Sequence, residues 1–547
     1  MIRPLVALLA ALALGSTQAY ARCPDLIFSA GLEDFVDAPN CDEEAARFLT
    51  MATFGPSPAE ITRLRAIGYD VWFQQQFAQA PTLARPFLEA LQAGGTVLSQ
   101  GLRQDRWFTT AVYAPDQLRQ RVAFALSQIL VISDRVDTLS GDILGVAEFS
   151  DILASQAFGS YRETLEQVTL SPQMGRFLTS LRNNGAANAT TTPDENYARE
   201  VMQLFTIGLT RRNLDFSPVL DAQNQPVPTY DQIAVTNYAK VFTGWTYSGS
   251  ASFGNGQANF LQMMCFEANH NIQPKVLLEG FTLPGGANRC RPDLESALDV
   301  LVNHPTAAPF LSRQLIQRLV TSNPSSAYIQ RVANVFVNNG SGVRGDLTAV
   351  VRAVLMDSEA RNSPVGAFGK AREPLLKLTA IWRALEAQPV LADRMGTQNP
   401  EGAFAQRHLG AATVFNFYEP DYQQPGPIET ANLYSPELQI INESTIVGTG
   451  NALRSRSQDA YVGMATPPTD GRPLVNLAPL IALVPSAAGH GALIDELNRR
   501  LMYGSMSPQM RAILLTMLAN RPTETPLDKV RQVVSVILLS PEFAVQN

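Results

Sequence analysis

One stretch, Thr192 to Gly208, carries both a start signal and a stop signal for a helix in this chain of 547 residues. Thr192 is placed to cap the helix, Pro193 suits the first helical position, and Glu195 can close a capping box back to Thr192. Gly208 is the residue that a left-handed C-terminal cap prefers. Apolar residues recur at helical spacing between these ends. The stretch therefore predicts an amphipathic helix that packs against other helices.

The other face of this helix is polar and carries Asn196, Arg199, Glu200 and Gln203. Periodicity alone favours a face in contact with solvent. The alternative is a pocket wall. A buried carboxylate and guanidinium must then pair with each other or with a polar ligand, because an unpaired buried charge costs several kcal/mol. The sequence leaves both interpretations open.

Helical patterns also dominate the rest of the chain. Periodicity and caps predict helices at about 43–51, 57–68, 70–79, 83–93, 103–112, 116–132, 142–157, 160–169 and 229–242. Residues 213–228 read as a loop. Residues 246–290 are rich in Gly, Ser and Asn and contain short β-like pieces such as Lys275 to Leu278. We therefore predict a mostly α fold, a large multi-helix domain with an irregular, disulfide-bonded insertion that contains little β structure.

The C-terminal half contains a weak internal repeat with an offset of 182 residues. Leu315–Val320 is echoed by Leu497–Met502, and Asp346-Leu347 by Asp528-Lys529. Chance similarity between amphipathic helices is the alternative, and two copies do not make a solenoid. No Gly/Ser-rich linker divides the chain, so we predict one large helical domain over residues 43–547.

Residues 1–21 have the pattern of a secretory signal peptide, with Arg3, an apolar run from Leu5 to Leu14 and the cleavage site Ala19-Tyr20-Ala21. The run is too short for a permanent membrane anchor, and there is no twin-arginine pair. Residues 22–42 read as an N-terminal arm. We predict a secreted or periplasmic protein that uses a Sec-type signal and has no integral membrane segment after its removal.

Charge and motifs exclude several functions. The formal net charge is −7 and no run of lysine or arginine occurs, which argues against nucleic acid as a partner. The chain lacks the G-x-S-x-G elbow, the phosphate loop, the G-x-G-x-x-G fingerprint after a strand and the H-E-x-x-H zinc motif. These absences argue against a lipase-like hydrolase, a nucleotide-dependent enzyme and a zincin. They do not argue against an enzyme whose catalytic residues are dispersed along the chain.

The four cysteines fit export. Cys23 and Cys41 form one local couple, and Cys265 and Cys290 form another, which suggests two disulfides, although four cysteines allow three pairings. No C-x-x-C spacing occurs, so a zinc site is less favoured. We expect no metal site and no cofactor.

The central stretch resembles the signature of a bacterial family catalogued as domain of unknown function 1800. Its matching residues are Asn196–Glu200 and Gln203–Gly208, and other stretches that resemble the family are Ala52–Ser57, Phe242–Trp245, His270 with Lys275, His304-Pro305, Lys370–Pro374 and Phe415–Tyr422. The resemblance runs from about Glu44 to the C-terminus and implies no established activity. It does imply a partner. Members are often encoded beside a family called domain of unknown function 1501, which resembles alkaline phosphatases and sulfatases.

Dispersed polar residues are the candidates for chemistry. Glu200 and His270 are candidates for proton transfer, because histidine titrates near neutral pH. Arg199 and Lys275 are candidates for stabilising an anion. Each also has a structural reading, for example His270 as a polar loop residue.

Candidates for substrate contact are Asn196, Gln203, Trp245, Tyr418 and Asp421. Tyr418 and Asp421 belong to Phe415–Tyr422, where carboxylates lie among aromatic residues, as in carbohydrate sites. The alternative is an aromatic loop that fills a gap between helices.

Two classes of function follow. The first is an exported enzyme that acts on an extracellular or cell-envelope substrate such as a glycan. The second is a non-catalytic binding or export-associated partner of the alkaline-phosphatase/sulfatase-like protein. The feature that discriminates them is whether the candidate residues converge on one pocket or spread through the core.

Overall fold

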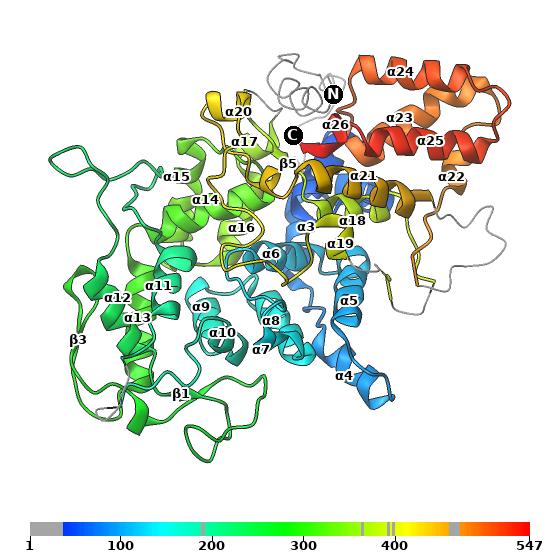
Figure 1. Cartoon of the computed structure of the whole chain (residues 1–547). Helices are drawn as coiled ribbons and strands as arrows, with labels where there is room; N and C mark the ends of the chain where they lie inside the picture. The colour runs from blue at the N-terminus through cyan, green and yellow to red at the C-terminus, as the bar shows by residue number, and fades with distance from the viewer. Residues whose placement is uncertain (1–36, 187–191, 363–365, 391–393, 397–399, 459–470) are drawn as a thin grey trace.

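The computed structural model describes residues 37–186, 192–362, 366–390, 394–396, 400–458 and 471–547 (Figure 1). The predicted signal peptide, Cys23 and most of the N-terminal arm lie outside these residues. Within them the chain consists of helices joined by loops, and every described strand is two residues long. The predicted mostly α fold is therefore confirmed.

The predicted helices are present, with ends that shift by a few residues. Gly68, which was predicted to end a helix, has φ 75° and forms a kink inside α3. The helices up to residue 361 are α2 (Asp42–Ala52), α3 (Pro58–Ala78), α4 (Arg85–Ala93), α5 (Gln100–Tyr113), α6 (Gln117–Ser127), α7 (Asp137–Ser140), α8 (Ile143–Gln156), α9 (Tyr161–Thr169), α10 (Pro172–Phe177), α11 (Asn196–Glu200), α12 (Gln232–Val241), α13 (Cys290–Asn303), α14 (Ala307–Leu319), α15 (Ser326–Val337), α16 (Leu347–Met356) and α17 (Ser358–Arg361). The later helices are α18 (Pro374–Ala384), α19 (Pro400–Phe404), α20 (Pro427–Thr430), α21 (Glu443–Gln458), α22 (Ala478–Ile481), α23 (His490–Met502), α24 (Pro508–Ala519), α25 (Pro526–Leu538) and α26 (Pro541–Ala544).

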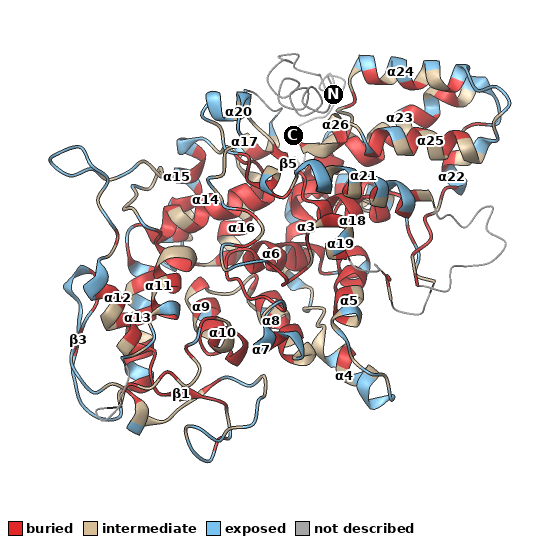
Figure 2. Cartoon of the chain, in the orientation of Figure 1, coloured by how far each residue is buried: buried red, intermediate tan, exposed pale blue. Residues whose placement is uncertain are grey.

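The buried apolar side chains form two cores. The first lies mainly among α2, α3, α6, α8, α9 and α12–α16, and the second mainly among α5, α18 and α23–α25. Figure 2 shows the buried residues along the inward faces of these helices. Helix α6 joins the cores, because Val122 belongs to the first and Phe124 to the second. Gly55 brings the chain against α18. A Cβ atom there would lie 2.5 Å from Ala380 Cα, so no other residue fits.

The repeat in the sequence is present in the structure. Helices α14–α17 and α23–α26 have the same order, with two long helices, a third helix and a short fourth one. Ser325 caps α15 and donates its hydroxyl to Glu359, while Ser507 caps α24 and donates to Glu542. Ser507 lies 182 residues after Ser325. The same side-chain contact thus closes both units, which chance similarity between helices would not produce.

The segments that follow the two units cross over. Strand β5 (Lys370–Ala371) follows the first unit and pairs antiparallel with β6 (Val545–Gln546), which follows the second. Arg372 donates to Leu501 O at the end of α23, and Gln546 donates to Leu319 O at the end of α14. Each segment therefore caps a helix of the other unit, and this exchange ties the two cores together.

The predicted insertion is irregular and contains little β structure, as expected. Its strands are β1 (Trp245–Thr246), β2 (Met264–Cys265), β3 (Lys275–Val276) and β4 (Thr282–Leu283), paired β1 with β2 and β3 with β4. Short 3-10 turns, η2 (Glu267–Asn269) and η3 (Leu278–Gly280), separate them. The Cys265–Cys290 disulfide joins β2 to the start of α13, which confirms that predicted pairing. Cys41 is also disulfide-bonded, and Cys23, its predicted partner, lies outside the described residues.

Limited proteolysis should cut the native protein first within 213–228 or 246–262. The first segment projects from the body as an irregular hairpin on the left of Figure 1, and Leu220 to Pro226 at its tip are exposed. Exposed polar loops are the preferred sites of nicking. Mass spectrometry of early fragments tests this prediction, and first cuts inside α14 or α18 would contradict it.

Candidate functional site

The central helix differs from its prediction in where it begins and in its form after Glu200. It begins at Asn196, so Thr192 and Glu195 do not form the expected capping box. The Glu195 carboxylate instead accepts from Gln232 Nε2 at 2.8 Å and Thr236 Oγ1 at 2.9 Å, both on α12. Asn183 bonds the backbone N–H and C=O of Asp194 and holds this segment outside the helix. Tertiary hydrogen bonds have overridden the local capping signal.

After Glu200 the backbone changes to a π-helix, η1 (Val201–Thr206). Thr206 Oγ1 donates to Val201 O at 2.6 Å, and the amides of Ile207 and Gly208 both bond to Met202 O. Gly208 has φ 68°, the left-handed conformation that its prediction as a C-terminal cap required. π-helical turns are rare in proteins, and those that occur often lie at functional sites. The polar residues beside this turn are therefore candidates for function.

The polar face of the helix is neither fully solvated nor a closed network. Asn196 is exposed and Gln203, half-buried, accepts from Tyr230 OH at 3.2 Å. Arg199 is 41% exposed at its side chain and pairs with Glu195, with 3.3 Å between Nη2 and Oε2. Glu200 is only 7% exposed, and its Oε2 atom has no hydrogen-bond partner among the described residues. Burial raises the pKa of Glu200, and the charge of Arg199 opposes this shift.

Glu200→Gln should therefore keep or increase stability. The raised pKa means that the carboxyl group favours folding below about pH 4, and this contribution is lost as pH rises through the folded-state pKa. The free energy of unfolding of Glu200→Gln relative to wild type should thus increase from pH 4 to pH 8. Thermal melts across this range measure it.

The matched control is Glu195→Gln on the adjacent turn. Its carboxylate has partners on α12, so this change should cost about 1 kcal/mol at pH 7. A loss of about 3 kcal/mol in Glu200→Gln would instead indicate that Glu200 has a buried cationic partner.

His270 and Lys275 are brought together by a residue that the sequence analysis missed. Asp293, in the first turn of α13, is fully buried, and its Oδ2 atom lies 2.8 Å from Lys275 Nζ and 3.2 Å from His270 Nε2. Its Oδ1 atom lies 2.8 Å from Arg289 Nη2. His270 and Lys275 are 1% and 0% exposed. Both oxygens of Asp293 are therefore used within a buried ion cluster.

His270 and Lys275 also form hydrogen bonds with the backbone. His270 Nδ1 lies 3.0 Å from Thr243 O, and Lys275 Nζ donates to Asn271 O at 2.7 Å and to Gln273 O at 3.2 Å. Burial lowers the pKa of Lys275, while Asp293 opposes that shift. The cluster fastens the insertion to α13. The one sequence signal for Asp293 was an acidic residue in the first turn of a helix that begins at a predicted disulfide.

The turn before Trp245 shapes the same region. Gly244 has φ 88°, and a Cβ atom there would lie 3.1 Å from Cys265 Sγ and 3.1 Å from His270 N. Glycine is therefore required both by its conformation and by space. Trp245, a candidate for substrate contact, lies in β1, is 4% exposed and pairs with Cys265. Its ring is packed in the first core.

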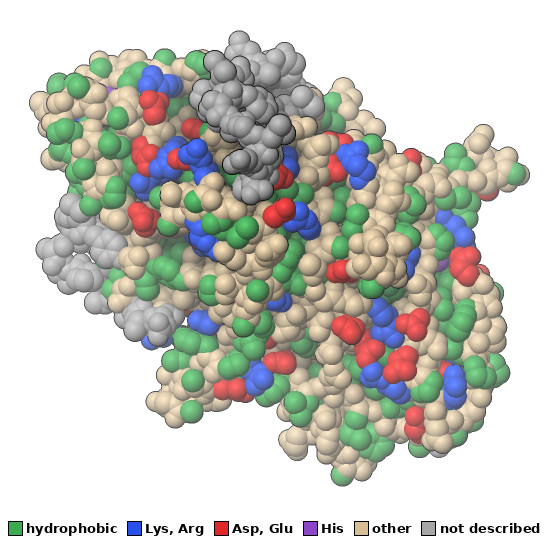
Figure 3. All heavy atoms as spheres, turned by 180° about the vertical axis from the view of Figure 1, so that it is seen from behind, with side chains coloured by type: hydrophobic (Ala, Val, Ile, Leu, Met, Phe, Trp, Pro, Cys, Tyr) green, Lys and Arg blue, Asp and Glu red, His purple; other side chains and the backbone are tan. Residues whose placement is uncertain are grey.

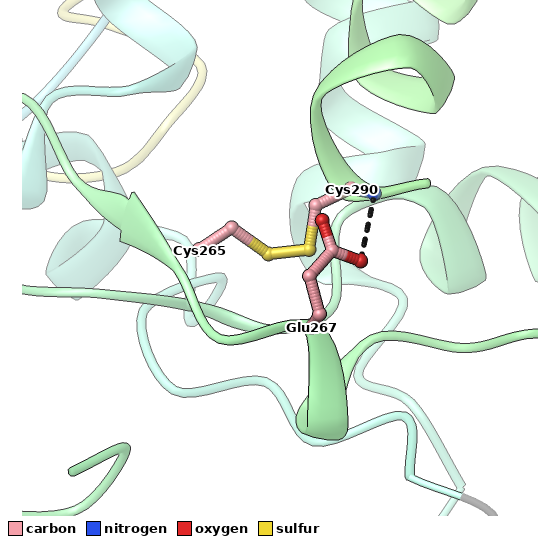
Figure 4. Close-up of side chains that lie close together, drawn as sticks. All are labelled: Cys265, Glu267 and Cys290. Atoms are coloured by element: carbon pink, nitrogen blue, oxygen red, sulfur yellow. Dashed lines mark hydrogen bonds between the residues drawn. A yellow bond between two sulfur atoms is a disulfide. The ribbon is translucent and has the colours of Figure 1, made fainter. Parts of the chain in front are cut away.

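The carboxylate of Glu267 lies beside the disulfide (Figure 4). Glu267 Oε2 accepts from Arg289 N at 3.0 Å and Cys290 N at 3.4 Å, and so caps the start of α13. One ligand atom from each of Cys265, Glu267 and Cys290 lies within 4.8 Å of the others. Anionic groups are favoured at a helix N-terminus, so the cap stabilises the helix that carries Asp293.

Tyr418 and Asp421 lie elsewhere. Tyr418 is buried and its hydroxyl lies 3.2 Å from Gln128 Oε1 in a second ionic cluster. Burial and the nearby carboxylates of Glu373 and Glu437 raise the pKa of Tyr418. Asp421 is exposed.

The second cluster is centred on Lys370, whose Nζ lies 2.9 Å from Glu437 Oε1 and donates to Gln317 O and Arg318 O. Glu373 accepts from Gln128 and Gln406. Lys370 and Glu373 come from the stretch Lys370–Pro374, and Tyr418 comes from Phe415–Tyr422. These two stretches therefore meet in the second cluster, between the repeat and the aromatic loop.

The candidate residues thus fall into separate groups. No hydrogen bond or ion pair between described residues joins Glu200 to His270 or Lys275, or either group to Tyr418. On the face shown in Figure 3, basic side chains are interspersed with acidic ones. The polar residues are distributed through the fold, and many of them hold its elements together.

Comparison with known proteins gives one match. Residues 47–545 match the family described as "Protein of unknown function (DUF1800)". No curated protein and no solved structure matches the chain. Among the helices that the structure describes, none combines the length and the apolar character needed to cross a membrane.

Proposed function

The chain belongs to the DUF1800 family of proteins of unknown function, and from that premise we propose that it is an exported binding protein that positions a partner. The Asp293 cluster is the main support. A reaction at His270 and Lys275 would need a free ring nitrogen and a free ammonium group, yet both face Asp293 and backbone carbonyls at 0–1% exposure. In this proposal His270 and Lys275 stabilise the fold, and the partner binds to the surface of the protein.

The proposed partner is a protein of the family called domain of unknown function 1501, which resembles alkaline phosphatases and sulfatases. The resemblance of the central stretch to its family supports this choice, because members of the two families are often encoded side by side. The apolar segment from Leu5 to Leu14 supports export, and the disulfides suit an oxidising compartment.

The test is to purify the mature chain and the neighbouring protein of that family separately and to measure their association. We expect a complex on size-exclusion chromatography with a Kd of about 1 μM or tighter, that is, about −8 kcal/mol. An unrelated alkaline phosphatase of similar size is the control and should not bind. Absence of a complex, together with turnover of a glycan or ester by the chain alone, would overturn the proposal.

Glu200 supports a second candidate, an enzyme with a buried general acid or base. Its free Oε2 atom, its raised pKa and the adjacent π-helix are the features that such a residue shows. A screen of glycan and ester substrates should then find an activity that Glu200→Gln lowers by at least 100-fold without loss of stability. Equal turnover by wild type and Glu200→Gln would remove this candidate.

A further inference from the structure

We propose that Cys265, Cys290 and Glu267 form a zinc site when the disulfide between the two cysteines is reduced. This inference is independent of the proposed function. One ligand atom from each residue already lies within 4.8 Å of the others. Figure 4 shows the three side chains close together. Two thiolates and a carboxylate are ligands that Zn²⁺ takes at about 2.0–2.3 Å, and a water molecule would complete the tetrahedron.

The backbone around the two cysteines suits either state. Their Cα atoms are 6.3 Å apart, in the upper part of the range of about 4.4–6.8 Å that disulfides span. This separation also suits two thiolates on one metal ion, whose sulfur atoms lie further apart than those of a disulfide. Cys265 and Glu267 are half-buried and Cys290 is fully buried, so solvent meets the site on the side of Cys265 and Glu267.

The start of α13 positions two of the three ligands. Cys290 is the first residue of α13, a helix of 14 residues, and the partial positive charge at a helix N-terminus favours anionic groups beside it. The Glu267 carboxylate is already oriented by the amides of Arg289 and Cys290. A ligand held in place before the metal arrives loses little freedom on binding. His270 and Asp293 are used in their own cluster and stay outside the site.

The two states exclude each other because they use the same sulfur atoms. A thiol reductant supplies two electrons and two protons, which cleave the S–S bond and give two thiols, while the reductant is oxidised to its own disulfide. Zn²⁺ then displaces one proton from each thiol as it binds. Bound Zn²⁺ would keep the insertion attached to α13 before oxidation and protect the thiols from reaction.

The test uses the full mature chain, reduced under native conditions with a phosphine and titrated with Co²⁺ as a coloured substitute for Zn²⁺. We expect one equivalent to bind, with thiolate-to-cobalt charge-transfer absorption that Zn²⁺ abolishes. The oxidised protein should give no such absorption. Cys265→Ser should remove the charge-transfer absorption, and Glu267→Gln should weaken binding at least tenfold. Cys41→Ser is the matched control and should leave the signal unchanged.

Thiol alkylation gives a second readout that does not depend on the variants. Stoichiometric Zn²⁺ should slow alkylation of Cys265 and Cys290 at least tenfold in the reduced wild-type protein and leave Cys41 unaffected. Peptide mapping assigns each modified residue. Absence of Co²⁺ absorption in the reduced wild type, or equal affinity in wild type and Glu267→Gln, would overturn the three-ligand site.

Discussion

Asp293→Asn should lower the free energy of unfolding by about 3–5 kcal/mol at pH 7, the cost of removing one partner from a buried ion pair. In the wild type, Lys275 Nζ lies 2.8 Å from Asp293 Oδ2. The change keeps the shape of the side chain at position 293 but leaves the buried ammonium of Lys275 without a carboxylate. Arg289 loses the same partner but is partly exposed and can turn to solvent. Urea unfolding followed by circular dichroism measures the loss.

The pH dependence of this variant provides a further check. Burial lowers the pKa of Lys275, and removing Asp293 takes away the charge that opposes this shift. A lysine whose folded-state pKa lies below its unfolded value near 10.4 becomes easier to bury as pH rises. The deficit of Asp293→Asn should therefore shrink between pH 7 and pH 10.

Glu295→Gln, two residues further along α13, is the control for this prediction. It removes a surface ion pair with Arg291 whose side chains are 45% and 47% exposed, and should change stability by less than about 0.5 kcal/mol. If Asp293→Asn behaved like Glu295→Gln, the cluster would not fasten the insertion to α13.

The second large effect is expected at Glu437. Glu437→Gln should destabilise the protein by about 3 kcal/mol or more, because the ammonium of Lys370 is 0% exposed and loses its carboxylate at 2.9 Å. The carbonyls of Gln317 and Arg318 still accept its hydrogen bonds but carry no compensating charge. Guanidinium unfolding at pH 7 measures the change.

A double-mutant cycle separates the ion pair from its surroundings. Lys370→Met combined with Glu437→Leu should recover most of the stability lost by either single change, because a buried pair is often replaced by apolar residues at little net cost. The surface pair of Arg511 and Asp495, with side chains 41% and 58% exposed, is the control and should show coupling below about 0.5 kcal/mol. Additive losses at Lys370 and Glu437 would contradict direct pairing.

Features that depend on neighbouring residues are readable from the sequence. Helical periodicity, the left-handed turn at Gly208 and the pairing of Cys265 with Cys290 all concern residues that lie close along the chain. The repeat is readable because it compares the chain with itself, and the Ser–Glu contacts of its two units confirm it. The helices and the turn at Gly208 are controlled by local backbone hydrogen bonds, and the disulfide closes one loop of the chain, so nearby residues decide their energy.

The charged residues show where local reasoning ends. Glu195 and Glu200 lie on adjacent turns of one segment, yet Glu195 is paired across to α12 and Glu200 is buried with a free oxygen atom. Nothing within the segment distinguishes them, since their environments depend on how α12, α13 and α14 pack around it.

Asp293 also shows that the partner of a charged residue depends on tertiary packing. His270 and Lys275 were identified as chemically interesting, but the carboxylate that occupies them lies on another helix. The local pattern marks a residue as able to carry charge. Only the packing of distant elements decides whether the charged group contacts solvent, pairs with another side chain or is buried without a partner. The reason is that desolvation and Coulomb energies depend on distance in space and not on distance along the chain.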